Sequence, residues 1–183
     1  MNQLRPESRA EHQPSSAALG IARRALRDDA DWFTIEGVAP PSGTTCIGDL
    51  VAGGGAGIEH LVPVGAPPVA YVELVSAVGW SVLWPLVRSV ADERALLAVD
   101  VSSIRFEPPV DGGEPDRVWW PPGATVAEVI DDDAGALAAY RRLVAMTIEA
   151  CTPLVEAVRA RAAYGRVGLW SLLADVFRSV GPS

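Results

Sequence analysis

The sequence predicts an α+β fold that is mainly α, with one small antiparallel β-hairpin. Two segments, residues 71–90 and 134–163, carry apolar side chains at steps of three and four, which is the spacing of one helix face. Between them, residues 96–106 and 117–120 are rich in β-branched and aromatic side chains, which favours strands. At 183 residues the chain fits one domain, so we expect a single domain over residues 15–183 after a disordered tail at residues 1–14.

The first elements are short. Ser15 or Ser16 can cap a helix over about residues 17–30, because serine side chains accept hydrogen bonds from free amides at a helix start. Trp32, Phe33 and Ile35 should form a short extended segment or pack against the helix end, and a second short helix should pass through Leu50. The glycine-rich residues 52–57 then predict a flexible turn; no Lys-Ser/Thr pair follows them, so they do not form a phosphate-binding loop.

Pro67 and Pro68 predict the start of the next helix, which Pro85 should kink or divide because proline removes a helix hydrogen bond. Trp80 and Trp84 are four residues apart and should share one side. The apolar face consists of Tyr71, Leu74, Val75, Val78, Val82, Leu86 and Val90.

A hairpin should follow, with strands over residues 96–106 and 117–120 and a turn at Asp111-Gly112-Gly113. Residues 125–130 fit either a strand or a short helix. Asp131-Asp132-Asp133 precedes the longest helix, where carboxylates either cap the helix and favour its dipole or bind a hard cation.

The longest helix is predicted over residues 134–163, with a bend at Pro153. A last helix should begin near Gly165 or Arg166 and bury Trp170, together with Leu173, Ala174 and Phe177. The predicted buried stripe of the long helix consists of Leu137, Tyr140, Val144, Ile148, Cys151, Val155 and Val158.

Composition excludes several functions. The net charge of −8 argues against nucleic-acid binding. No uninterrupted apolar run reaches the length of a membrane span, and no signal peptide is recognisable, so we expect a cytoplasmic protein. Residues 134–183 nevertheless hold six arginines against three acidic residues, which indicates either a basic face for an anionic ligand or ordinary helix surfaces.

Catalytic and metal-binding patterns are weak in this sequence. Cys46 and Cys151 stand far apart, outside any CxxC pair, and Cys151 fits a buried position. His12 lies in the predicted tail and His60 beside the glycine turn. We therefore assign no catalytic residue and no metal ligand.

Arginines near the end of the chain are the candidate ligand-binding residues. Arg159, Arg161 and Arg166 lie at the junction of the last two helices, and a guanidinium suits carboxylate or phosphate groups. Glu156 stands three residues before Arg159 and can pair with it. Trp119 and Trp120 should point to opposite faces of their strand, so that one of them can line a cleft.

Four passages in this order resemble the FhuF-like ferric-siderophore reductases. They are Tyr71-Val-Glu-Leu with Gly79-Trp80 and Trp84-Pro85-Leu86; residues 99–106 with Trp119-Trp120-Pro121-Pro122; Leu154-Val-Glu-Ala-Val-Arg159-Ala-Arg161; and Arg166-Val-Gly-Leu-Trp170-Ser-Leu-Leu-Ala174. The resemblance covers roughly residues 40–180, and Ser171 stands where the family has asparagine.

The resemblance implies a cytoplasmic iron-uptake protein that reduces a ferric siderophore through a [2Fe–2S] cluster held by four cysteines. With two cysteines, neither at a matching position, this sequence cannot supply that ligand set. It therefore looks like a truncated or degenerate member, or a scaffold kept for binding alone.

Three functions follow as hypotheses. The first is a siderophore-linked protein without its own cluster, whose ligand lies between the helices and the hairpin against Arg159, Arg161, Arg166, Trp119, Trp120 and Trp170. The second is a metal-free enzyme of specialised metabolism, with Glu59 and His60 as suspects. The third is a non-catalytic interaction protein that dimerises through the long helix, which an exposed apolar stripe on residues 134–163 would favour.

Overall fold

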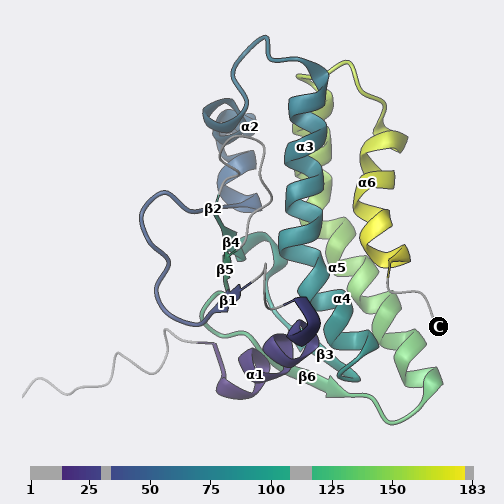
Figure 1. Cartoon of the computed structure of the whole chain (residues 1–183). Helices are drawn as coiled ribbons and strands as arrows, with labels where there is room; N and C mark the ends of the chain where they lie inside the picture. Colours follow the sequence, from purple (N-terminus) through teal and green to yellow (C-terminus); the bar gives the residue numbers. More distant parts are fainter. Residues whose placement is uncertain (1–13, 30–33, 108–116, 180–183) are drawn as a thin grey trace, which may run out of the picture.

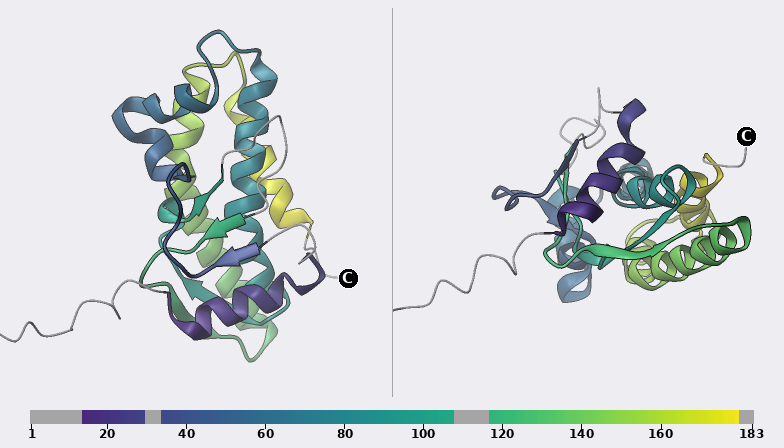
Figure 2. Two further views of the ribbon diagram at one scale, coloured as in Figure 1. Left: turned by 60° about the vertical axis from the view of Figure 1, so that its left-hand side comes forward. Right: turned by 90° about the horizontal axis from the view of Figure 1, so that it is seen from below.

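Helices form most of the structure, as the sequence predicts. The computed structural model describes residues 14–29, 34–107 and 117–179; the predicted tail before Pro14 and the Asp111-Gly112-Gly113 turn lie outside these ranges. Helices α3 (Pro68–Val78) and α4 (Trp84–Ala91) follow one another and run beside α5 (Asp133–Arg159) and α6 (Arg166–Arg178) (Figure 1). The short helix α1 (Ser16–Ala25) crosses one end of this bundle, and α2 (Ile47–Leu61) lies against α5 near the other (Figures 1 and 2).

Helix α1, Ser16–Ala25, begins at the predicted cap, because Ser15 Oγ accepts a hydrogen bond of 3.2 Å from the Ala18 amide. It ends earlier than predicted and continues into one 3₁₀ turn, η2, Arg27–Asp29. The earlier end fits the carboxylates of Asp28 and Asp29, which are unfavourable at the negative end of a helix dipole. Ile35 lies in the short strand β1, Thr34–Glu36.

Helix α2, Ile47–Leu61, contains the glycine turn within its length. Cys46 caps it, since its Sγ accepts from the Asp49 amide at 3.4 Å. Gly53, Gly54 and Gly55 have φ of +60°, +74° and +94°, values that favour glycine and break the helix into two parts.

Pro85 divides the next helical segment as predicted. Helix α3, Pro68–Val78, passes through a π-helical stretch, η3, Gly79–Leu83, into α4, Trp84–Ala91. The rings of Trp80 and Trp84 lie 5.2 Å apart between centroids, on one side as expected. Together, residues 68–91 are long and apolar enough to cross a membrane, but 67% of the most apolar window is buried in the fold, as in the core helix of a soluble protein.

The predicted hairpin is present in part. Its first predicted strand, residues 96–106, is divided into two strands that pair with different partners. Strand β4, Arg105–Phe106, pairs antiparallel with β5, Arg117–Trp119, in a four-stranded sheet of order β1-β5-β4-β2, where β2 is Thr45–Cys46. Strand β3, Ala95–Ala98, instead pairs with β6, Thr125–Val129, in a second antiparallel sheet. Residues 125–130 therefore form mainly a strand, and a 3₁₀ turn, η4, Val101–Ser103, separates β3 from β4.

Helix α5, Asp133–Arg159, starts where Asp132 Oδ1 accepts from the Gly135 amide at 2.7 Å, which confirms the capping role of the aspartate run. Pro153 does not end the helix. The predicted buried stripe is wrong for the first half of α5, where Leu137, Val144 and Ile148 are 54%, 39% and 50% exposed. The residues buried there are Ala139, Leu143 and Thr147, and the second half buries Cys151, Leu154, Val155 and Val158.

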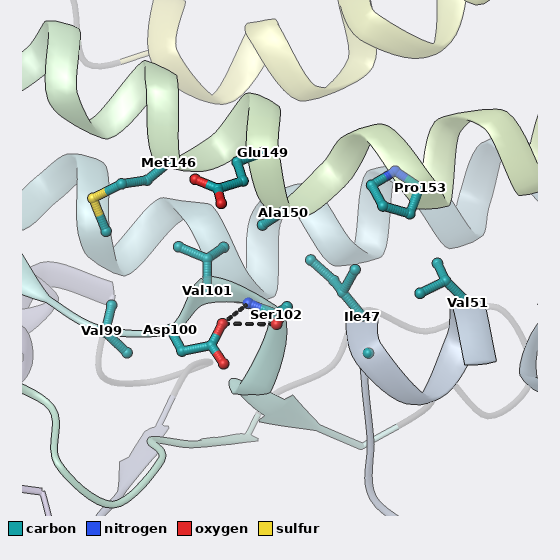
Figure 3. A pocket seen from close by; sticks show the side chains of 11 residues that line it. Ile47, Val51, Val99, Asp100, Val101, Ser102, Met146, Glu149, Ala150 and Pro153 are labelled. Atoms are coloured by element: carbon teal, nitrogen blue, oxygen red, sulfur yellow. Dashed lines mark hydrogen bonds between the residues drawn. The ribbon is translucent and has the colours of Figure 1, made fainter.

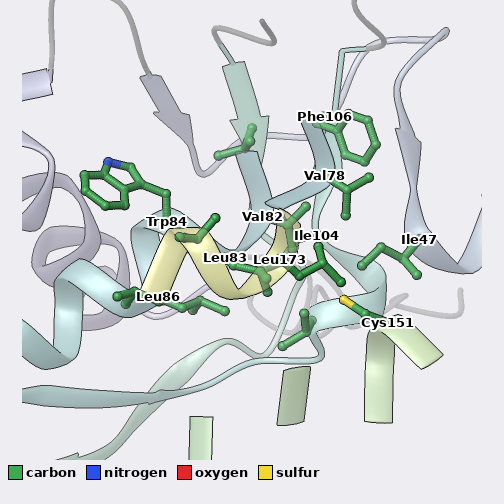
Figure 4. Packing of buried hydrophobic residues seen from close by; sticks show 14 of the residues in the cluster. Ile47, Val78, Val82, Leu83, Trp84, Leu86, Ile104, Phe106, Cys151 and Leu173 are labelled. Atoms are coloured by element: carbon green, nitrogen blue, oxygen red, sulfur yellow. The ribbon is translucent and has the colours of Figure 1, made fainter. Parts of the chain in front are cut away.

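Helix α6, Arg166–Arg178, packs on α3, η3 and α5 through Leu169, Leu173 and Val176. Trp170, Ala174 and Phe177 are only partly buried, so its inner face is rotated from the predicted one. The core gathers side chains from the helices and the sheet, including Phe106, Ile104, Val82, Leu83, Leu173 and Cys151 (Figure 4).

Candidate functional site

The predicted arginines lie together near the junction of α5 and α6, and Glu156 joins two of them. Arg159 Nε donates to Glu156 Oε2 at 2.9 Å, as the sequence spacing suggests. Arg166 Nη2 lies 2.8 Å from Glu156 Oε1, so one carboxylate serves two guanidinium groups. The side chains of Arg159 and Arg166 are 56% and 60% exposed, so each guanidinium group keeps donors open to solvent, although Glu156 Oε1 itself is buried.

Arg161 has a different role, because it ties α2 to the end of α5. Its Nη2 donates to Glu59 Oε1 and to the Gly54 carbonyl, each at 3.0 Å, and Nη1 donates to the Ala157 carbonyl at 3.1 Å. The side chain is only 20% exposed. These bonds to both helices hold the glycine turn in place and occupy the donors that a ligand would need.

A hollow of about 300 Å³ lies on the outer face of α6. Arg166, Trp170 and Arg178 line it, because steps of four bring side chains to one face of a helix. Arg178 Nη1 donates to Asp175 Oδ1 at 2.6 Å in another exposed pair. The remaining lining residues are Val167, Ser171 and Ala174. The hollow thus combines two guanidinium groups with an indole.

Trp119 and Trp120 do not contribute to this hollow. They are 4% and 3% exposed, so neither is the exposed member of the pair. The physical reason is that β5 lies inside the four-stranded sheet, with β1 on one side and β4 on the other, and packs on η3. Of the six predicted ligand residues, the structure brings Arg166 and Trp170 together in one hollow.

A second hollow, of about 380 Å³, lies between the start of α2, η4 and the middle of α5 (Figure 3). Ile47, Val51 and Pro153 form an apolar end, and the carboxylates of Asp100 and Glu149 lie on opposite sides. Hydrogen bonds from the Ser103 hydroxyl, and then from Ser102, lower the pKa of Asp100 below its ordinary value although burial opposes them.

This second hollow was missed by reasoning from the sequence. The Asp100-Val-Ser-Ser run is a local signal for a capped turn, since aspartate often accepts from backbone and hydroxyl groups two and three residues on. Nothing in the sequence indicates that Glu149 lies opposite this turn, because that proximity depends on how α5 packs on η4.

His60 lines a third hollow, of about 530 Å³, beside the glycine turn. Asp49 is the acidic residue among its lining side chains, and its Oδ2 accepts from Arg105 Nη2 at 2.6 Å. Glu59 is engaged by Arg161. Among the described residues, no ion pair joins Glu59 to His60, the two suspects of the enzyme hypothesis.

The two cysteines serve the fold at separate places. Cys46 caps α2, and Cys151 is fully buried on α5. Burial raises the pKa of the Cys151 thiol to about 12, which fits the predicted role as a small hydrophobic residue. Among the residues that the structure describes, no group of three or more His, Cys, Asp or Glu side chains is arranged to hold a metal ion.

The raised thiol pKa has a consequence for stability in alkali. The unfolded chain loses its thiol proton near the ordinary cysteine pKa of about 8.5, whereas the folded chain retains it up to about 12. The stabilising contribution is therefore complete below pH ~8.5 and is lost as the pH rises toward about 12, by up to about 1.4 kcal/mol per pH unit.

We expect urea unfolding at pH ~8 and pH ~10.5 to show this loss in the wild-type protein, and a smaller loss in Cys151→Ser, because a serine hydroxyl does not titrate there. Cys46 and Tyr140, whose pKa values burial also raises, remain in both proteins as a common background. Equal pH dependence in the two proteins would show that Cys151 does not contribute.

The fold and the α6 hollow define a mainly helical α+β domain with a basic, aromatic-lined surface site. A comparison with models of known protein families and with curated proteins finds no match, so the resemblance to ferric-siderophore reductases rests on the residues quoted above.

Proposed function

We propose that this protein binds a ferric siderophore or a related anionic chelate in the α6 hollow, in the cytoplasm, as part of siderophore-linked iron uptake and without an iron–sulfur cluster of its own. The observation that carries the proposal is the shared hollow of Arg166, Trp170 and Arg178. Residues 166–174, which resemble the reductase family, lie on the same helix, α6, and so support it as the ligand-binding element.

The chemistry of the hollow favours an anionic aromatic chelate. Guanidinium groups donate paired hydrogen bonds to carboxylate or phenolate oxygens. The Trp170 indole offers an apolar wall against which a catechol ring can pack. Asp175 holds Arg178 in an exposed pair, so a ligand oxygen can replace that carboxylate at small cost. Arg166 can bind the ligand through the guanidinium donors that Glu156 does not use.

Binding should therefore follow the charge of the chelate. We expect a trianionic tris-catecholate complex to bind and raise the melting temperature, and an uncharged tris-hydroxamate complex to bind more weakly. The gallium(III) forms allow Trp fluorescence to be followed without quenching by iron. Losing one charge-assisted hydrogen bond costs about 1.5–3 kcal/mol, so Arg166→Gln should weaken tris-catecholate binding by roughly tenfold or more.

Arg159→Gln is the matched control. Arg159 pairs with the same Glu156 carboxylate but does not line the hollow, so its replacement should leave the affinity nearly unchanged. The proposal fails if the wild-type protein shows no saturable binding of the tris-catecholate, or if Arg159→Gln and Arg166→Gln reduce affinity equally.

A further inference from the structure

The hollow between α2, η4 and α5 carries negative charge that no arginine neutralises. Asp100, which caps η4, and Glu149 of α5 line it from opposite sides, and its described lining contains no arginine or histidine (Figure 3). Elsewhere in the described chain, Asp49, Glu59 and Glu128 each lie 3.0 Å or less from an arginine nitrogen. Two like charges that face one another across a hollow repel, and a cation between them removes that repulsion.

The sequence around Glu149 leaves this carboxylate without a partner on its own helix. Its neighbours three and four residues away are Ala145, Met146, Thr152 and Pro153, and none of them is basic. No ion pair joins Glu149 to any residue that the structure describes, although its side chain is exposed. A ligand in the hollow can therefore use Glu149 without breaking an existing bond.

Ser102 and Ser103 hold the Asp100 carboxylate in place and keep it ionised. The amide and the hydroxyl of Ser102 donate to Oδ1 at 3.0 and 2.7 Å, and the Ser103 hydroxyl donates to Oδ2. The bond from Ser103, followed by those from Ser102, lowers the pKa of Asp100, so the carboxylate is charged at neutral pH. A carboxylate accepts about four hydrogen bonds, which leaves room for an outside donor.

The rest of the hollow selects an organic cation over a metal ion. Mg²⁺ and Ca²⁺ take about six or more oxygen ligands, whereas no group of three or more potential ligand side chains lies together among the described residues. Beside the carboxylates, Ile47, Val51 and Pro153 form an apolar end that suits a hydrocarbon chain (Figure 3). A molecule with an ammonium group at one end and an alkyl chain at the other matches both parts.

We propose that this hollow binds an aliphatic primary amine in its ammonium form, with the ammonium group between Asp100 and Glu149 and the alkyl chain against the apolar end. An ammonium group has three donors, and the Ser102 hydroxyl oxygen supplies a third acceptor beside the two carboxylates. The volume of about 380 Å³ compares with about 30 Å³ for one water molecule, so roughly ten non-hydrogen atoms fit. The hollow shares no lining residue with the α6 hollow, and the proposal does not depend on siderophore binding.

Calorimetric titration of the full chain with n-hexylammonium chloride at pH ~7 tests the proposal. We expect saturable binding with a dissociation constant below about 1 mM. The uncharged 1-hexanol and the anionic hexanoate should bind at least about tenfold more weakly, because neither supplies charge-assisted hydrogen bonds to the carboxylates. n-Butylammonium lacks two methylene groups and should bind roughly tenfold more weakly than n-hexylammonium.

Two isosteric substitutions separate the hollow from the general negative charge of the protein. Glu149→Gln should weaken n-hexylammonium binding by about tenfold or more, because it removes one of the two facing charges. Glu73→Gln is the matched control, since Glu73 is exposed on α3, outside the hollow, and its replacement changes the net charge equally. Binding to this variant should equal binding to the wild type, and circular dichroism checks that both variants fold.

Three results would overturn the proposal. The first is the absence of saturable n-hexylammonium binding up to about 10 mM. The second is an equal loss of affinity in Glu149→Gln and Glu73→Gln, which would indicate nonspecific attraction to an acidic protein. The third is Mg²⁺ or Ca²⁺ binding that displaces n-hexylammonium and is lost in Glu149→Gln, which would identify a hard-cation site instead.

Discussion

Replacing Gly57 by alanine is expected to destabilise the protein by roughly 3 kcal/mol or more, a large share of the stability of a domain this size. The glycine turn folds the second part of α2 back onto the first, so that Gly57 lies against the backbone of Asp49 and Leu50. A Cβ atom at residue 57 would stand 2.3 Å from the Asp49 carbonyl oxygen and 2.9 Å from Leu50 Cα. Because these are backbone atoms, they cannot rotate away as a side chain can.

Gly20→Ala provides the control for this substitution. Gly20 lies inside α1, and an added Cβ would meet only the end of the Arg24 side chain, at 3.6 Å. Alanine is the better helix former by about 1 kcal/mol, so this variant should be as stable as the wild type or more stable. Urea unfolding measures both; a Gly57→Ala protein of wild-type stability would show that the two parts of α2 do not pack as described.

The second large effect is expected within α5, where two leucines six residues apart should respond in opposite ways. Leu143 is 1% exposed and lies in the core. Its replacement by alanine removes buried methyl groups and leaves a cavity, which costs about 2–5 kcal/mol. Leu137 is 54% exposed, so the same replacement there should cost less than about 1 kcal/mol in the monomer.

Denaturant unfolding separates the two values. The sequence pattern alone assigned Leu137 to the buried stripe and did not include Leu143. A larger loss for Leu137→Ala than for Leu143→Ala would restore that assignment.

Local signals predicted much of the fold because they act over a few residues. Ser15 and Asp132 accept hydrogen bonds from amides three residues on, which is a short-range interaction that composition and order reveal. Pro67 starts a helix and Pro85 divides one for reasons of backbone chemistry that no tertiary contact changes. The glycine turn was predicted because glycine adopts positive φ values without steric cost, which is also a local property.

The candidate site was predicted only in part. Arg166 and Trp170 share a hollow because they stand four residues apart on one helix, which is a property of the sequence. Arg161, by contrast, contacts Glu59 from 102 residues away, and Trp119 and Trp120 are buried where β5 pairs with β1 from far earlier in the chain. The position of Glu149 opposite Asp100 across the second hollow also depends on long-range packing.

By itself, the sequence determined the mainly helical α+β class and the caps and breaks of its helices, and its 183 residues hold two cysteines, fewer than the four thiolates of one cluster. Only the tertiary structure decided which side of α5 faces the core. Apolar residues occur around most of that helix, so spacing allows more than one buried stripe. The packing of α2, α4 and α6 on α5 selects the stripe that includes Leu143, Cys151 and Leu154 and leaves Leu137, Val144 and Ile148 in solvent.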